Sequence, residues 1–159
     1  MKILTKYGDA TIEELEGDKW GEPGSPAPVV NECYRLRHLQ LRRLTVENIR
    51  MLLGQNIGLY YLVPLAIEHL SEDPLLQAAF YPGDLLCTVL RVNGSFWISE
   101  PTARAEIEAI VERGRALAAT KDTNVMRWLD ESIATFSSGA SAKSANVYGG
   151  KRSRGKSSS

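Results

Sequence analysis

Apolar residues recur at intervals of three and four along most of the chain, the spacing that places them on one face of an α-helix. Two segments near the carboxyl end show it most clearly. Their apolar positions are Ile107, Ile110, Val111, Gly114, Leu117 and Ala118 in the first, and Val125, Trp128, Leu129, Ile133 and Phe136 in the second. Upstream, the same spacing predicts a helix that begins after a capping Thr45 and ends at Gly54. Each of these helices is expected to bury one face.

The most apolar part of the chain is GQNIGLYYLVPLAIEHL, residues 54–70. It predicts a helix over about 58–70 that is buried on most sides, in which Pro64 causes a kink or delays the start to Leu62. Asn56 is expected to cap this helix. The paired glycines of GQNIG are similar to a phosphate-binding loop, but the lysine of a P-loop and a preceding strand are missing. The pattern therefore favours a tight junction between two helices.

Two shorter helices are predicted near the amino end. Residues 11–16 can form one, with Thr11 or Asp9 as its cap and acidic residues in its first turn. Residues 29–39 can form the other, because apolar positions recur there at helical spacing. Its polar face is expected to carry Arg35, Arg37 and His38. The intervening GEPGSPAP cannot continue a helix.

Turn-forming residues divide the middle of the chain. Asp73 before Pro74 predicts a helix start that opens LLQAAFY. The sequence YPGD at 81–84 predicts a type II turn, and Asp84 can cap the run LLCTVLRV, which suits a buried helix or a strand. Asn-Gly at 93–94 is a hairpin signal, but its flanks are uneven. We expect a loop there that carries Phe96 and Trp97 back onto the core.

Together these elements predict an all-α fold, a compact bundle of about six to seven helices joined by short turns. Residues 1–136 are expected to form one helical domain, and 137–159, rich in Ser, Gly and Lys, a flexible tail with almost nothing to bury. The 43% hydrophobic and 24% charged residues are ordinary for a globular protein. Cys33 and Cys87 lie in apolar patterns and are expected to be reduced core residues.

The amino terminus lacks the apolar stretch of a secretory signal, and the longest apolar run, 57–67, is about half of what spans a bilayer. A cytoplasmic location is therefore expected, with no membrane contact. Catalytic side chains are scarce as well. His38 and His69 have no metal-site spacing around them and are expected to be structural or solvated. Neither an enzyme nor a protein with a cofactor or a metal is expected.

The formal net charge of zero hides an uneven distribution. Residues 1–140 carry 14 Lys and Arg against 19 Asp and Glu, whereas 141–159 carry 5 basic residues and no acidic one. The acidic excess is concentrated in residues 9–22, where six acidic residues face one base, Lys19. A basic partner would be attracted to this segment. The basic tail instead suggests a solubilising end, or a nucleic-acid-binding module as an alternative function.

Several stretches together resemble the immunity proteins of bacterial contact-dependent growth inhibition systems. They are TIEELEGDKWGEP, LTVENIRMLLGQNIGLYYLVPLAIEHL, and FYPGDLLCTVL with FW following, and they extend over residues 11–97. The resemblance implies a small cytoplasmic protein that binds and neutralises the carboxy-terminal toxin domain of a CdiA-type protein, commonly a nuclease, delivered by a sibling cell. It also implies a monomer that forms a 1:1 complex and performs no chemistry. The alternative is a helical adaptor with no toxin partner.

Two surfaces are candidates for the contact with a toxin. The first consists of Glu13, Glu14, Glu16 and Asp18 with Trp20, since a nuclease must present positive charge to its phosphate substrate. However, residues shared among immunity proteins for different toxins are expected to maintain the fold. Specificity is then expected on the exposed faces of the late helices, around Arg104, Glu108, Glu112 and Arg115.

Overall fold

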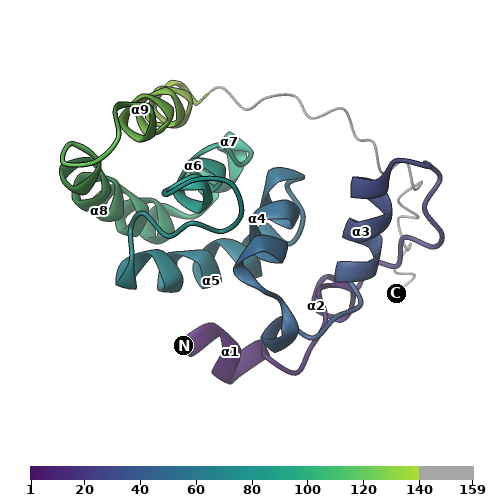
Figure 1. Cartoon of the computed structure of the whole chain (residues 1–159). Coiled ribbons are helices and arrows are strands. Elements are labelled where there is room, and N and C mark those ends of the chain that lie inside the picture. Colours follow the sequence, from purple (N-terminus) through teal and green to yellow (C-terminus); the bar gives the residue numbers. More distant parts are fainter. Residues whose placement is uncertain (140–159) are drawn as a thin grey trace.

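The apolar faces predicted from the sequence meet around three central helices. The computed structural model in Figure 1 describes residues 1–139. Within them it contains no strand, one 3-10 helix and nine α-helices: α1 Lys2–Tyr7, α2 Ile12–Glu16, α3 Pro28–Leu36, η1 Leu41–Arg43, α4 Val46–Gly54, α5 Leu59–Glu72, α6 Asp84–Leu90, α7 Gly94–Ser99, α8 Pro101–Ala118 and α9 Thr123–Ser138. Helices α4, α5 and α6 pack on one another. Helices α8 and α9 cover α5 and α6 at the left of Figure 1, and α3 packs on α4 at its right.

This arrangement confirms the all-α fold class, although the described residues carry more helices than the six or seven expected. The additional helices are short. Helix α1 was not predicted, α6 was ambiguous between helix and strand, and α7 was predicted as a loop. The predicted flexible tail falls outside the described residues except for its first three: Ser137 and Ser138 complete α9, and Gly139 is its C-cap.

Helix α5 forms the centre of the core, as its apolar sequence predicts. Six of its residues are buried: Leu62, Val63, Leu65, Ala66, Ile67 and Leu70. The helix begins at Leu59, so Pro64 lies inside it and does not delay its start. Helix α8 buries the predicted face with one exception, Leu117, whose residue surface is 43% exposed. Cys33 and Cys87 are buried, as predicted.

Helices α2 and α4 both begin with the caps expected from their sequences. The Thr11 hydroxyl accepts from the Glu14 N–H at 3.1 Å, and the Glu14 carboxylate accepts from the Thr11 N–H at 2.9 Å. Thr45 and Asn48 form the same reciprocal pair at the start of α4. These bonds satisfy first-turn amides that have no partner within the helix. They fix where both helices start.

The predicted cap of α5 is wrong. Asn56 adopts a left-handed backbone conformation, with φ of 56°, and its side-chain oxygen accepts from the Asn93 N–H at 2.7 Å. It therefore ties the α4–α5 junction to the start of α7. The N-cap position of α5 is taken by Gly58, with φ of 66°. A Cβ added to Gly58 would lie 3.2 Å from the Ile12 side chain, because α2 packs directly against this junction.

Replacing Gly58 with alanine is expected to lower the free energy of unfolding by about 2–4 kcal/mol, because the left-handed conformation and the contact with Ile12 both resist a side chain. The matched control is Gly17→Ala, since Gly17 has a similar φ of 62° and nothing within 4 Å of an added Cβ. Its expected loss is about 1–2 kcal/mol. Urea unfolding followed by circular dichroism measures both. Equal losses would show that the contact with Ile12 contributes nothing.

The helix predicted after Asp73 and Pro74 is wrong, since residues 74–83 form no helix. Three successive amides of this segment, those of Ala78, Ala79 and Phe80, donate to the Asp84 carboxylate at 2.6, 2.9 and 2.8 Å. Asp84 therefore binds the preceding loop instead of capping its own helix. The carboxylate competes successfully because it is buried and can accept several bonds at once.

The two neighbouring predictions had different outcomes. The YPGD turn is confirmed: the Asp84 N–H donates to the Tyr81 carbonyl at 3.1 Å, and Gly83 has the positive φ of 89° that a type II turn requires. The loop predicted at 93–94 is wrong, because Asn93 caps α7 by accepting from the Ser95 N–H at 3.1 Å. Phe96 and Trp97, on α7, are buried as expected.

Candidate partner-binding surface

The acidic segment is held against the body of the protein by the inner face of α2. Ile12 is fully buried against the α4–α5 junction, and the Leu15 carbonyl accepts from the Tyr61 hydroxyl at 3.2 Å. An isolated bridge between Thr11 and Gln40 fixes the start of the helix beside η1. In Figure 1 α2 lies at the lower right, next to α3. The inner face of α2 is thereby fixed, and its carboxylates lie toward solvent or toward α3.

We refer to Glu13, Glu14, Glu16, Asp18 and Glu22 as the acidic surface. Its members fall into two groups. Glu14, Glu16 and Glu22 are exposed. Glu13 and Asp18 are half-buried, and their carboxylates make contacts within the protein. The Glu13 carboxylate contacts His38. The Asp18 carboxylate accepts from the Trp20 indole N–H at 3.1 Å. The carboxylates best placed to meet a partner are therefore those of Glu14, Glu16 and Glu22, of which the Glu14 carboxylate also caps α2.

Beneath the acidic surface lies Arg37, whose residue surface is 1% exposed. Its Nη2 donates to the Asp18 carbonyl at 2.8 Å, and its guanidinium lies 3.8 Å from the centroid of the Trp20 ring. Its Nη1 is 3.9 Å from a carboxylate oxygen of Glu13. The prediction that Arg37 belongs to the polar face of its helix is wrong, and α3 ends one residue before it.

Glu13 is held from a second direction by His38. The His38 Nε2 lies 2.8 Å from a Glu13 carboxylate oxygen, and the Nδ1 lies 2.8 Å from the Tyr34 carbonyl oxygen. Both ring nitrogens thus lie beside oxygen atoms of the protein. His38 therefore links the Glu13 carboxylate to the Tyr34 carbonyl at the end of α3.

The buried arginine and its carboxylates influence each other's ionisation. Although Glu16 reaches solvent, partial desolvation by the surrounding protein raises the pKa of its carboxyl, against the opposing effect of the Arg37 charge. Burial lowers the pKa of the Arg37 guanidinium, and the negative charges of Glu16, Asp18 and Glu13 act against this. The guanidinium remains charged, since arginine is not deprotonated in proteins. The acidic surface therefore encloses one positive charge.

Two hollows border these carboxylates. One, of about 480 Å³, is lined by Glu13, Lys19, Gly21, Glu22, Pro23, Asn31, Tyr34, Arg35 and His38. The other, of about 420 Å³, is lined by Glu13, Glu14, Gly17, Asp18 and Lys19. Both include Glu13 and Lys19. The surface is therefore indented next to Glu13 and Lys19, and it offers recesses that a partner's side chains can enter.

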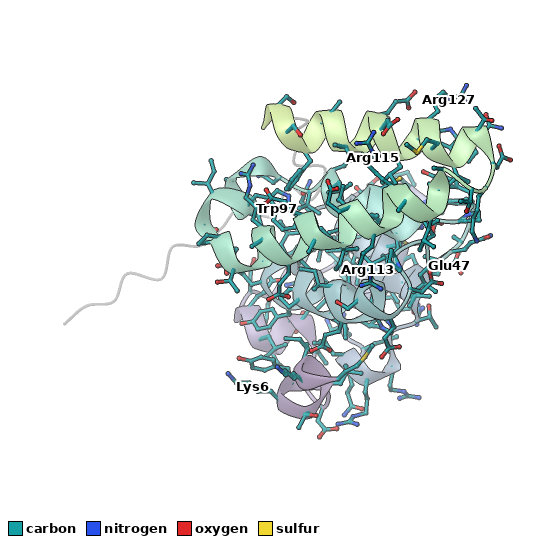
Figure 2. All side chains as sticks on the ribbon, turned by 90° about the vertical axis from the view of Figure 1, so that its left-hand side faces the viewer. Lys6, Glu47, Trp97, Arg113, Arg115 and Arg127 are labelled. Carbon is teal, nitrogen blue, oxygen red and sulfur yellow. The ribbon has the colours of Figure 1, made fainter. Side chains whose placement is uncertain are left out.

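The second set of candidates lies on the other side of the molecule, along α8. Arg104 pairs with Glu108 at 3.1 Å, and Glu112 is exposed. Figure 2 shows Arg115 between the ribbons of α8 and α9, where it pairs with Asp130 at 3.3 Å. The structure does not bring this set together with the acidic surface, because α4, α5 and α6 separate them in Figure 1.

Groups suited to catalysis or metal binding are sparse in the part of the chain that the structure describes. No cluster of three or more His, Cys, Asp or Glu in residues 1–139 is arranged to hold a metal ion. Burial raises the pKa of the Cys87 thiol, which disfavours the reactive thiolate. Burial also lowers the pKa of His69. None of the helices within these residues has the length and apolar character needed to cross a membrane.

Comparison with protein families tests the resemblance seen in the sequence. The family described as CDI immunity proteins, those of contact-dependent growth inhibition, matches residues 14–107, more than half of the chain. The chain belongs to this family. The match confirms the resemblance seen in the sequence over 11–97 and identifies the molecule as an immunity protein of such a system. Neither the curated proteins nor the solved structures contain a match.

The matched segment of this immunity protein includes most of the acidic surface but ends on α8 before Glu108.

The sequence pattern predicted the acidic residues of this surface but did not predict the role of Arg37, the residue that they surround. A signal was present, because Arg37 follows Val30 and Cys33 at helical spacing and so falls on their buried face. An arginine at an apolar position was the clue to a buried charge.

Proposed function

We propose that this immunity protein binds the carboxy-terminal toxin domain of a CdiA-type protein in the cytoplasm and neutralises it. Such a complex would protect the producing cell from toxin delivered by its siblings. Membership of the family supports the role, and the exposed carboxylates of the acidic surface support the place of contact. The toxin is proposed to be a nuclease, whose basic substrate groove would complement these carboxylates.

The proposed mechanism is steric and electrostatic. A nuclease groove binds phosphate with positive charge, so a surface that presents Glu14, Glu16 and Glu22 attracts it over a distance and accelerates encounter. Once docked, the carboxylates occupy the positions of phosphate groups and the body of the protein excludes the nucleic acid. The protein acts as a stoichiometric inhibitor in a 1:1 complex, and it neither catalyses a reaction nor binds nucleic acid itself.

The late helices are the competing location for the contact. Glu108, Glu112 and Arg115 lie beyond the matched segment and on the opposite side from α2, where residues can change without disturbing the family framework. We place the primary contact on the acidic surface, because its exposed members, Glu14, Glu16 and Glu22, all carry negative charge. The face of α8 carries paired charges of both signs, such as Arg104 with Glu108. Steering by α8 would therefore be weaker.

The proposal is tested by co-expression with the toxin domain encoded by the neighbouring gene. Cells that produce the toxin are expected to survive only when this protein is present, and the purified pair is expected to co-elute as a 1:1 complex. Absence of both rescue and co-elution would favour the adaptor alternative. A salt-sensitive shift of RNA or DNA by the protein alone, lost on deletion of 141–159, would instead favour a nucleic-acid-binding module.

A further inference from the structure

We propose that Arg37 is the positioning residue of the acidic surface and that its buried guanidinium sets the conformation in which the toxin is bound. This inference rests on the proposed function. Arg37 itself is inaccessible, with 1% of its residue surface exposed, so a docked partner cannot touch it. Any effect that it has on binding must pass through the residues that it holds.

The contacts of Arg37 reach both sides of the end of α2. Within the helix, its Nη1 faces the Glu13 carboxylate at 3.9 Å. Beyond the helix, its Nη2 donates to the Asp18 carbonyl at 2.8 Å, and its guanidinium stacks on the Trp20 ring at 3.8 Å. Gly17, with φ of 62°, ends α2 between these two groups of contacts. One side chain thus joins the helix to the segment that follows it.

Local structure alone cannot hold this segment. Helix α2 has five residues, far fewer than an isolated helix needs to be stable in water. Its carboxylates also repel one another at close range. The buried positive charge offsets that repulsion, since Glu16, Asp18 and Glu13 all interact favourably with the guanidinium. Ile12 and Tyr61 anchor the inner face of α2, and Arg37 adds the counter-charge and the link between the helix and the segment that follows it.

Replacing Arg37 with methionine distinguishes two possible effects of Arg37 on toxin binding, because its positioning of the carboxylates and its positive charge predict opposite changes in affinity. The substitution removes one positive charge from beneath the acidic surface and makes its potential more negative. If charge alone mattered, a basic partner would associate faster and bind more tightly. If Arg37 positions the carboxylates, the complex becomes weaker despite the more favourable charge. The sign of the change separates the two.

The first experiment measures hydrogen exchange in the free protein, without a toxin. Arg37→Met is expected to accelerate exchange of the amides of residues 13–17 by about 10-fold or more, because bonds to a buried charge are lost, while α5 and α6 remain protected. The control is Arg43→Met, which removes the same charge from an exposed residue of η1. Unchanged exchange at 13–17 overturns the proposal. Uniform loss of protection across α5 and α6 overturns it too, by making Arg37 an ordinary part of the core.

The second experiment measures binding of the purified toxin domain. Arg37→Met is expected to dissociate about 10-fold faster than the unaltered protein, and Arg43→Met at the unaltered rate. Arg37→Lys keeps the charge but loses the planar stack on Trp20, so it is expected to be intermediate. An Arg37→Met complex as long-lived as the original overturns the proposal. If the unaltered protein does not bind the toxin, the proposed function fails, and hydrogen exchange alone still decides whether Arg37 positions the acidic surface.

Discussion

Replacing Asp84 with alanine is expected to lower the free energy of unfolding by about 3–5 kcal/mol. The Asp84 residue surface is 2% exposed, and its carboxylate accepts from the amides of Ala78, Ala79 and Phe80. It also faces the largely buried Arg50, whose Nε lies 4.0 Å away. Alanine would leave three amides unsatisfied and the arginine charge without its counter-charge. Circular dichroism during urea unfolding measures the loss.

Asp73 provides the matched control for this prediction. Its carboxylate is exposed and accepts from one backbone amide, that of Leu75, at 3.0 Å. Asp73→Ala is therefore expected to lower the free energy of unfolding by about 1 kcal/mol or less. Similar losses for the two variants would mean that the loop before α6 does not depend on the buried carboxylate, contrary to the geometry.

Reversing the charge of Glu16 and Glu22 to lysine is expected to slow association with the toxin domain by about 10- to 100-fold and to flatten its salt dependence. Both side chains are exposed. They are preferred over Glu13 and Asp18, whose reversal would also break contacts with His38 and Trp20. Stopped-flow association rates at several ionic strengths measure the effect.

The same charge change can be made on the opposite side of the molecule. Glu108→Lys with Glu112→Lys adds as many positive charges to the exposed face of α8. This pair is expected to slow association by less than about threefold, since charges distant from the contact are screened by salt. A larger effect on α8 than on α2 would move the contact to the late helices and refute the proposed role of the acidic surface.

The parts of the fold that were predictable are those in which burial follows from local spacing. Helices α5, α8 and α9 were identified because their apolar residues repeat with the period of the helix. Predictions failed where a distant group competed for backbone amides. Asp73 and Pro74 are a typical helix start, but no helix follows them. The amides of Ala78, Ala79 and Phe80, which would donate to carbonyls within that helix, donate to the Asp84 carboxylate instead. Asn56 was expected to cap α5 and instead accepts from Asn93.

The candidate site was predictable in composition but not in organisation. The sequence shows a concentration of acidic residues in 9–22, which indicates a negative surface. It does not show which carboxylates lie outward, because that depends on α3 folding back beneath the segment. The Glu13 carboxylate and the Asp18 backbone carbonyl face Arg37, which lies 19 residues beyond Asp18 along the chain, and only tertiary structure establishes these contacts.

The Arg37 guanidinium also separates the positions of the acidic surface that can change from the positions that are constrained. An exposed position such as Glu22 can be exchanged at small cost in stability, typically within about 0.5 kcal/mol. A change at Glu13 or Asp18 alters the surroundings of a buried charge and is therefore constrained by Arg37. A lineage that meets an altered toxin can therefore change the exposed carboxylates and keep the half-buried ones. Its binding specificity then changes while the conformation of the segment stays the same.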